Sequence, residues 1–296
     1  MRFLRASERC RAEQVHRVGN GNGRSRRRTV ARWVALASLT ICTGLLSASC
    51  QREKKDGDTD QAKSGQTAAH PPAKPETQGR ADEHAARVAA QVMDAMGGQK
   101  AWNDTRYLSW KFMGNRQHYW DKWTNDVRIE SNDVVILLNL DTKLGSVQKA
   151  GEQIVDGDAI QNYLERGYAW WVNDSYWMFM PYKLRDPGVD LVYGGEQVLS
   201  DGRPADVLTM MFESVGLTPR NKYDVYVDRE SHLVVQWSYY KDRDDPEPQF
   251  TAPWGGWQQF GKIKLATQHG RGQDWQIHVY DSLPRTVFES FGPVQA

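Results

Sequence analysis

Four histidines offer the side chains that enzymes most often use for catalysis and metal binding. His118, His232, His269 and His278 are far apart in the sequence, and no two of them have the His-Glu-x-x-His spacing that places two zinc ligands on one helix face. The sequence also contains no Gly-x-Ser-x-Gly nucleophile turn and no glycine-rich phosphate loop. We therefore predict that the protein is not an enzyme, has no catalytic residues, and carries neither a metal nor a cofactor.

Two acidic stretches could in principle bind calcium or take part in acid–base chemistry. In "DRDDPE", residues 242–247, a proline interrupts the carboxylates and the spaced ligands of a calcium loop do not occur, so we predict an exposed hairpin turn. In "DGDA", residues 156–159, Asp158 is predicted to cap a helix. Asp186 and Asp190 lie beside an aromatic run, and an envelope hydrolase, the least favoured interpretation, would use these carboxylates.

The N-terminal residues have the features of an export signal. A basic cluster, "RSRRRTVAR", precedes an uncharged apolar run at residues 33–46, which is too short for a membrane-spanning helix and typical of a signal-peptide core. We predict a signal peptide over residues 1–49. The first 23 residues are either a long basic region of that signal or an overextended start.

Cys50 is the predicted site of lipid attachment. The stretch "LLSASC", which ends at Cys50, resembles the bacterial lipobox, and no cysteine follows it, so the mature chain has no disulfide framework. Gln51 follows the cysteine, and the lack of an aspartate there favours the outer membrane. We predict a lipid anchor on the periplasmic side of the outer membrane. The alternative is cleavage by an ordinary signal peptidase, which would leave a soluble periplasmic protein.

Composition and charge change after the cysteine. Residues 51–79 contain alanine as their only apolar residue type, so residues 50–79 are predicted to be the anchor and a disordered tether. Residues 1–50 hold ten arginines and two glutamates, a net charge of +8, whereas the rest of the chain holds 28 basic and 35 acidic residues, a net charge of −7. An acidic mature chain does not favour nucleic acid as a partner. Residues 80–296 are predicted to form a single domain.

Aromatic residues dominate the predicted domain. Eleven of the twelve tryptophans lie after residue 100, and residues 176–181, "YWMFMP", place six apolar side chains in a row. Core packing is the favoured explanation for any one of these tryptophans, whereas their number together with the aromatic run favours a wide apolar cavity walled by aromatic and methionine side chains. The predicted cavity-lining residues are Trp110, Trp120, Tyr163, Trp171, Trp177, Met178, Phe179, Met180 and Trp237.

The elements that must position these side chains are mostly short strands. Apolar residues at helical spacing from Ala85 to Met96, followed by Gly97 and Gly98, predict one helix, and a second is predicted over residues 158–172. Two series of closely spaced strands, separated by turn signals, indicate antiparallel pairing. The predicted strands are residues 107–113, 118–123, 126–131, 134–140, 144–149, 197–212, 222–228, 233–240, 257–266 and 275–281.

The aromatic run itself has the alternation of a strand that is covered on both faces. Pro181 would end this strand, and "KLRDPG" would form a loop that returns to the sheet. Because a helix precedes the run, we predict that residues 176–181 form a hinge between that helix and the second half of the sheet. The same residues are predicted to form one wall of the cavity.

Four stretches of the chain carry a family resemblance: "AMGGQKAW", "YWDKWTNDVRIE", "NDSYWMFMPYKLRDPGVDLVY" and "FESVGLTPRNKYDVYVD". In this order they resemble a family of uncharacterised bacterial proteins of the outer-membrane lipoprotein-sorting kind, with "YW-x-x-MP-x-KL-x-DPGV" as the most specific string. That family is similar to the LolA and LolB periplasmic lipoprotein carriers. The resemblance implies an α+β fold that is mainly β: an unclosed antiparallel β-barrel, or half-barrel, wrapped around plugging helices and an apolar pocket for acyl chains.

Together these features predict a non-enzymatic, lipid-anchored periplasmic protein that acts as a monomer and binds an apolar ligand in a half-barrel cavity. The ligand would be the acyl chain of a lipoprotein or another lipid, in lipoprotein or lipid transport, and the membrane would be contacted through Cys50. The alternative is an envelope interaction module whose aromatic surface docks a partner protein.

Overall fold

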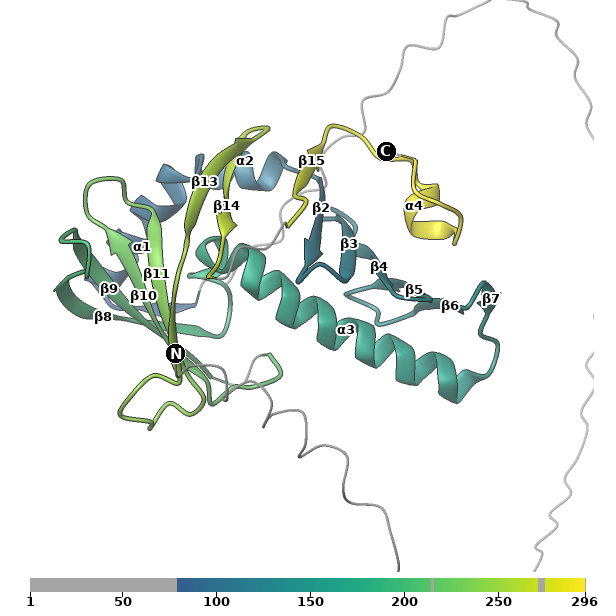
Figure 1. Ribbon diagram of the computed structural model, residues 1–296, viewed down its shortest axis with the longest axis horizontal. Helices are drawn as coiled ribbons and strands as arrows, with labels where there is room; N and C mark the ends of the chain where they lie inside the picture. The colour runs from purple at the N-terminus through teal and green to yellow at the C-terminus, as the bar shows by residue number, and fades with distance from the viewer. Residues whose placement is uncertain (1–78, 214–215, 271–274, 296) are drawn as a thin grey trace, which may run out of the picture. The chain divides into compact units, whose positions relative to one another are not determined.

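The computed structural model describes residues 79–213, 216–270 and 275–295, all of which belong to the unit Gly65–Ala296. These residues form a mixed α+β structure, mostly β, with two sheets, a separate hairpin and few helices (Figure 1). The predicted signal peptide, Cys50 and the predicted tether as far as residue 78 lie outside the described residues. Within the described part of the chain, no helix has the length and apolar character needed to cross a membrane.

One sheet has seven antiparallel strands in the order β15-β2-β3-β4-β5-β6-β7. Strands β2 to β7 follow one another as a meander, as the closely spaced strand signals predict, and β15 returns from far along the chain to pair with β2. The strands are β2 (Tyr107–Phe112), β3 (Arg116–Asp121), β4 (Asp126–Ser131), β5 (Val134–Asn139), β6 (Gly145–Lys149), β7 (Glu152–Gln153) and β15 (His278–Tyr280).

The other sheet has six strands in the order β1-β8-β9-β10-β11-β12, and only its β1–β8 pair is parallel among the described strands. The single strand predicted over residues 197–212 is wrong, because a turn at Gly202, where φ is +86°, separates β8 from β9. Its strands are β1 (Arg80–Ala81), β8 (Val189–Val198), β9 (Pro204–Phe212), β10 (Lys222–Asp228), β11 (Val234–Tyr240) and β12 (Phe250–Pro253).

Residues 257–266, also predicted as one strand, belong to a hairpin of two strands. Gly261, with φ of +58°, lies in the tight turn between β13 (Gly255–Phe260) and β14 (Ile263–Gln268). Among the described strands, neither sheet closes on itself. The predicted mainly β, α+β fold with an unclosed sheet is therefore confirmed, whereas a half-barrel wrapped around plugging helices stays a prediction.

The helices begin where carboxylates cap them. Asp82 accepts a hydrogen bond from the backbone N–H of Ala85 at 2.8 Å and so starts α1. Asp156 accepts one from the N–H of Ala159 at 2.8 Å and starts α3, so the predicted cap at Asp158 is wrong by two residues. The helical elements are α1 (Glu83–Ala95), α2 (Gly98–Asp104), α3 (Gly157–Phe179), the 3-10 turn η2 (Met180–Lys183) and α4 (Thr286–Glu289).

Helix α3 is longer than predicted and includes most of the aromatic run. It continues to Phe179, and Met180 and Pro181 then begin η2, so the predicted strand and hinge at residues 176–181 are wrong. The physical reason is that this end of α3 is covered from more than one side. Phe179 packs against Trp110 of the seven-stranded sheet, while Trp177 packs against Trp237 of the six-stranded sheet. A helix buried on several faces has no polar positions that reveal its period.

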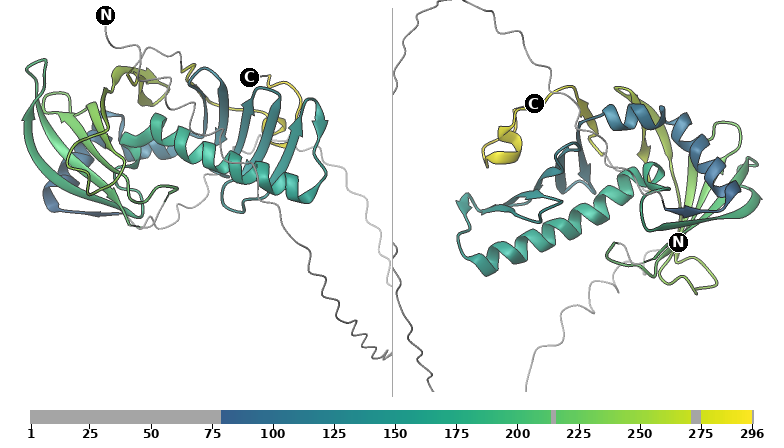
Figure 2. Two further views of the ribbon diagram at one scale, coloured as in Figure 1. Left: turned by 60° about the horizontal axis from the view of Figure 1, so that its bottom comes forward. Right: turned by 180° about the vertical axis from the view of Figure 1, so that it is seen from behind.

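Two glycines let α3 and the seven-stranded sheet approach closely. A Cβ atom on Gly167 of α3 would lie 3.0 Å from Cδ1 of Ile136, and one on Gly145 of β6 would lie 2.9 Å from Cδ2 of Leu164 of α3. The helix crosses the face of this sheet and contacts β5 and β6 (Figure 2). One core cluster includes side chains of α1, α3 and both sheets.

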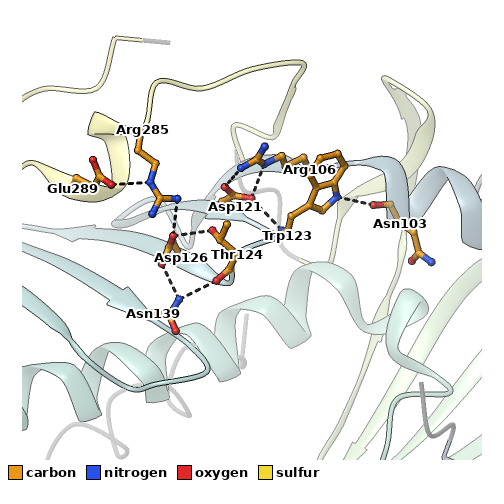
Figure 3. A network of polar contacts seen from close by, with 9 residues as sticks. All are labelled: Asn103, Arg106, Asp121, Trp123, Thr124, Asp126, Asn139, Arg285 and Glu289. Atoms are coloured by element: carbon orange, nitrogen blue, oxygen red, sulfur yellow. Dashed lines mark hydrogen bonds and ion pairs between the residues drawn. The ribbon is translucent and has the colours of Figure 1, made fainter. Parts of the chain in front are cut away.

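A polar network at the ends of the interior strands β3 and β4 reaches α4 and, through the hydrogen bond from Trp123 Nε1 to the carbonyl oxygen of Asn103, α2 (Figure 3). Asp121 of β3 accepts two hydrogen bonds from Arg106, at 2.9 and 2.8 Å. On the neighbouring strand, Asp126 is 3.1 Å from Arg285, which also binds Glu289 of α4 at 2.7 Å. This network is distant in sequence from the aromatic run and explains how the C-terminal residues are fastened to the sheet.

Candidate functional site

An aromatic cleft lies beside the C-terminal half of α3. Its volume is about 400 Å³, and its lining comes from α3, from the segment after η2 and from the six-stranded sheet. The helix contributes Tyr168, Val172 and Tyr176, whose i, i+4, i+8 spacing brings them to one side of the helix, together with Trp171 and Trp177. We call this cavity the aromatic cleft. The side chains that the sheet contributes are Val189, Phe212, Tyr223 and Trp237.

The floor of the aromatic cleft is a set of rings in contact with Trp237. Tyr223 stacks on Trp237 with centroids 5.1 Å apart and an interplanar angle of 4°. Trp177 meets the same indole edge to face, with centroids 4.7 Å apart. Both arrangements are favoured by the ring quadrupoles and hold the rings in defined orientations.

A second chain of rings connects the helix to the sheet. Tyr176 and Phe212 meet edge to face at 5.7 Å, and Phe212 and Tyr223 do so at 5.9 Å. Burial raises the pKa of Tyr176 well above its ordinary value and that of Tyr223 to about 12. Both hydroxyls therefore stay neutral at physiological pH, and the walls of the aromatic cleft carry no phenolate charge.

Lys183 and Asp186 are the charged side chains among the described residues that line the aromatic cleft. The Lys183 ammonium donates a hydrogen bond to Asp186 Oδ2 at 3.1 Å, and it lies 5.8 Å from the ring centre of Trp171 and 5.9 Å from that of Tyr176. These distances are within the range of cation–π attraction, about 6 Å. The cleft thus combines apolar walls with one ion pair, an arrangement that suits a ligand with an apolar body and a single polar end.

The structure brings three of the nine predicted cavity residues to the aromatic cleft: Trp171, Trp177 and Trp237. Tyr163 lies on α3, half-buried, under the Arg166 guanidinium at 5.3 Å. The other five, Trp110, Trp120, Met178, Phe179 and Met180, are buried members of the core cluster. A ligand role for any of the nine stays a prediction.

Sequence reasoning did not single out several residues that line the aromatic cleft. Tyr176 was inside the aromatic run, but a strand pattern gave no reason to place it with Phe212 and Tyr223. Those two lie on β9 and β10, and their meeting with α3 depends on tertiary packing. Lys183 could have been noticed, because "YKLRDPG" places a cation directly after the run.

A buried polar cluster lies on the opposite side of the same helix. Asp174 of α3 accepts hydrogen bonds from Arg116 at 2.7 and 2.8 Å, and its Oδ2 is 2.8 Å from His118 Nε2. His118 stacks on Trp110 with centroids 4.7 Å apart. His118 and Asp174 are both fully buried, so a substrate cannot reach them. The cluster fastens α3 to β3.

Protonation in this cluster follows from its burial. Burial lowers the pKa of His118 and outweighs the opposite effect of Asp174, so the imidazole is neutral. Burial would raise the pKa of Asp174, but the hydrogen bonds from Arg116 and His118 outweigh it and hold that pKa below its ordinary value. The carboxylate is therefore ionised and paired with the guanidinium.

The remaining residues considered for chemistry are dispersed. His269 is buried between Trp254 and Trp275, and neither of its ring nitrogens has a hydrogen-bond partner. The hydrogen bond from Arg80 lowers the pKa of Asp190, which is opposite to the shift that a general acid needs. No three His, Cys, Asp or Glu side chains in the described ranges are grouped so that they could hold a metal ion.

No protein-family model and no curated protein matches the chain. Similar solved structures include a DUF1329 family protein from Desulfovibrio piger, with 12% identity and a TM-score of 0.39; the match covers 69% of this chain and 96% of that protein. They also include a domain from Vibrio parahaemolyticus described as outer membrane lipoprotein-sorting, with 12% identity, coverage of 61% and 79%, and a TM-score of 0.29.

MucB is a third similar structure, with 14% identity, coverage of 72% of this chain and 64% of its own, and a TM-score of 0.23. It also occurs in a solved complex with MucA from Pseudomonas aeruginosa. At these identities and TM-scores, no residue role is transferred to this chain. The solved structures similar to it therefore include one of the outer-membrane lipoprotein-sorting kind that the sequence resembles.

Proposed function

We propose that this protein binds an apolar ligand, the acyl chain of a lipoprotein or another lipid, in the aromatic cleft and catalyses no reaction. The observation that carries the proposal is a cavity of about 400 Å³ whose walls are aromatic on both the helix side and the sheet side. Small-ligand sites range from about 300 to 1,000 Å³ and are mostly apolar with few polar groups. The single ion pair of Lys183 and Asp186 gives this cleft the same character.

Burial of methylene groups supplies the binding free energy. Each buried CH₂ contributes about 0.8 kcal/mol, so a chain of several methylenes is held without specific polar contacts. Trp177 and Tyr223, which pack against the buried Trp237, offer aromatic surface that would contact such a chain along its length. Lys183 lies beside the rings of Trp171 and Tyr176 and pairs with Asp186. Its ammonium can leave Asp186 and pair instead with a carboxylate at the end of the bound chain.

The cellular setting follows from the residues before the domain. We propose that residues 1–49 direct export, that Cys50 carries the lipid anchor, and that the tether holds residues 80–296 on the periplasmic side of the outer membrane. A domain held near a membrane is well placed to accept an acyl chain from a lipoprotein or a lipid. In that setting the open six-stranded sheet, with α3 beside it, would act as the half-barrel that encloses the ligand.

A second candidate function is the docking of a partner protein at the same place. Phe250 of β12 is 37% exposed and is stacked near Trp177, with centroids 6.2 Å apart. Leu217, which lines the aromatic cleft, is 53% exposed. Two exposed apolar side chains beside an apolar cleft also suit a hydrophobic side chain inserted by another protein.

Binding of cis-parinaric acid, a single-chain fluorescent fatty acid, tests the proposed function. The full chain should bind it saturably, and Val172→Trp, which places a large ring in the cleft, should weaken binding about tenfold or more, equal to about 1.4 kcal/mol. Asn162→Trp, at an exposed position of the same helix outside the cleft, is the matched control and should bind normally. No saturable binding, or equal binding by both variants, would exclude the cleft as an acyl-chain site.

A further inference from the structure

A second cavity borders the aromatic cleft. It has a volume of about 440 Å³ and is lined by residues of α1, α2, η2 and the segment that follows η2. Met93, Trp102 and Leu184 make much of this lining apolar. We call this cavity the helix groove. Asp186 and Pro187 line both the helix groove and the aromatic cleft, so this segment borders both cavities.

Arg185 lines the helix groove, and no acidic side chain pairs with it in the part of the chain that the structure describes. Its Nε is buried without a hydrogen-bond partner, and among the described residues its guanidinium forms no hydrogen bond or ion pair. Lys183, two residues earlier, lines the aromatic cleft instead and is paired with Asp186. Charged groups in apolar surroundings are normally paired, so Arg185 is suited to receive an anionic group from a ligand.

We propose that the aromatic cleft and the helix groove together bind one phospholipid with two acyl chains, one chain in each cavity and the phosphate on Arg185. The proposal rests on the proposed function, because the aromatic cleft takes one of the two chains. The phosphate would sit beside Asp186 and Pro187, the two residues that border both cavities, so that one chain extends to each side of them. A guanidinium binds a phosphate through two parallel hydrogen bonds, which fixes the head group as well as attracting it.

The acidic residues of the helix groove favour a head group with a single negative charge. Asp94 and Asp186 line the groove together with Arg185, and Asp186 is already neutralised by Lys183. A phosphomonoester with nearly two negative charges would be repelled by the Asp94 carboxylate more strongly than a phosphodiester would. A phosphodiester brings the one charge that Arg185 can neutralise.

Calorimetric titration of the full chain with two water-soluble lipids tests the head-group contact. The lipids are dioctanoylphosphatidylglycerol and dioctanoylglycerol, which has the same chains without the phosphate. Arg185→Gln removes the cation and should weaken binding of the phospholipid about tenfold while leaving dioctanoylglycerol unchanged. An equal loss of affinity for both lipids, or no loss of affinity for either, would overturn the assignment of Arg185 to the phosphate.

Blocking the groove tests the second chain. Ala90 is exposed and lines the helix groove, so Ala90→Trp should fill it without disturbing the core and should weaken binding of both two-chain lipids about tenfold. Asn162→Trp is again the control and should change neither affinity. Unchanged binding by Ala90→Trp would show that the second chain does not enter the groove.

Lauric acid separates this proposal from the proposed function. As a single chain it should bind the aromatic cleft, be weakened by Val172→Trp and be unaffected by Ala90→Trp. If lauric acid behaves so but the phospholipid binds no better than its one-chain lyso form, the two-chain proposal fails and the proposed function stands. If neither lauric acid nor the phospholipid binds, both the two-chain proposal and the proposed function fail.

Inorganic phosphate that displaces the phospholipid at equal concentration would identify a free-phosphate site and overturn the phospholipid assignment.

Discussion

The indole rings of Trp177 and Trp237 meet edge to face, with centroids 4.7 Å apart and an interplanar angle of 85°. Trp177 belongs to α3 and Trp237 to β11, so this contact joins the helix to the six-stranded sheet. Such aromatic pairs contribute about 0.5–1.5 kcal/mol beyond the area that they bury. Because the same two rings line the aromatic cleft, fold stability and the proposed binding depend on shared side chains.

Trp237→Ala should destabilise the protein strongly. Trp237 is 2% exposed, and removal of a buried tryptophan costs about 3–5 kcal/mol through lost burial and the cavity that remains. Urea unfolding followed by far-UV circular dichroism measures the change. Phe250→Ala removes a ring that packs on Trp237 but is partly exposed, and its effect should be clearly smaller. Equal losses of unfolding free energy in the two variants would show that Trp237 is not the centre of this packing.

Asp174→Asn should lower the free energy of unfolding by about 3–5 kcal/mol, because it leaves the Arg116 guanidinium without its buried counter-ion. The substitution preserves the shape of the side chain, so a loss of this size reports charge rather than packing. Asp201→Asn breaks an ion pair with Arg203 that is half exposed, and it should leave the unfolding midpoint unchanged. A midpoint for Asp174→Asn close to that of the unsubstituted protein would argue against the buried pair.

Stability should fall as the pH is lowered from about 6.5 towards 3. Burial lowers the pKa of His269 to about 3, and burial also lowers that of His118, whereas histidine in an unfolded chain titrates near 6.5. Between these values the unfolded chain binds more protons than the folded one, so acid favours unfolding; above pH 6.5 the histidines are neutral in both states and the effect disappears.

Urea midpoints at several pH values between 7 and 4 measure this dependence. His269→Phe replaces the unpartnered imidazole by an apolar ring and should make the pH dependence shallower. His278→Phe changes an exposed histidine and should leave the slope as it is. If His269→Phe retained the full slope, protonation of His269 would not be a source of acid sensitivity.

Gly145→Ala should be destabilising by about 1–3 kcal/mol, because the added methyl group would lie 2.0 Å from the carbonyl oxygen of Leu137 and force the strands apart. Gly157→Ala, in the first turn of α3, meets no atom within 4 Å and should be neutral or slightly stabilising. Thermal unfolding of the two variants provides the comparison. Equal melting temperatures would contradict the close approach of β5 and β6 at Gly145.

Cys50→Ser should release the protein from the membrane if Cys50 carries the predicted anchor. The wild-type chain should then be found in the outer-membrane fraction and incorporate labelled fatty acid, and the variant should do neither. Wild-type protein without label would favour ordinary signal cleavage instead.

The strands were predictable because their patterns are local. Strand β4 begins and ends at the predicted residues 126 and 131, and β10 at residues 222 and 228. In each case turn residues bound a short run whose side chains are all buried or half-buried. The two long predictions, 197–212 and 257–266, each overlooked one turn, since apolar residues continue on both sides of Gly202 and Gly261.

The end of α3 and the composition of the aromatic cleft could not be derived in the same way. Trp177 and Phe179 are covered by different sheets, so no polar residue interrupts "YWMFMP". Such an uninterrupted apolar run looks like a strand that is buried on both faces. Tyr223 reaches the cleft only because β10 pairs with β9 and α3 lies beside them. Asp174 and His118 are 56 residues apart, and no spacing rule connects them. Long-range packing decides all three features.

The buried attachment of Asp174 has a consequence for ligand affinity. Asp174 is one turn or less from Trp171, Tyr176 and Trp177, so the helix wall of the aromatic cleft cannot shift without breaking the hydrogen bonds to Arg116. That wall is preorganised: an incoming chain gives up its own conformational freedom but orders little of the protein. Selectivity among apolar ligands then depends on shape fit to a rigid surface.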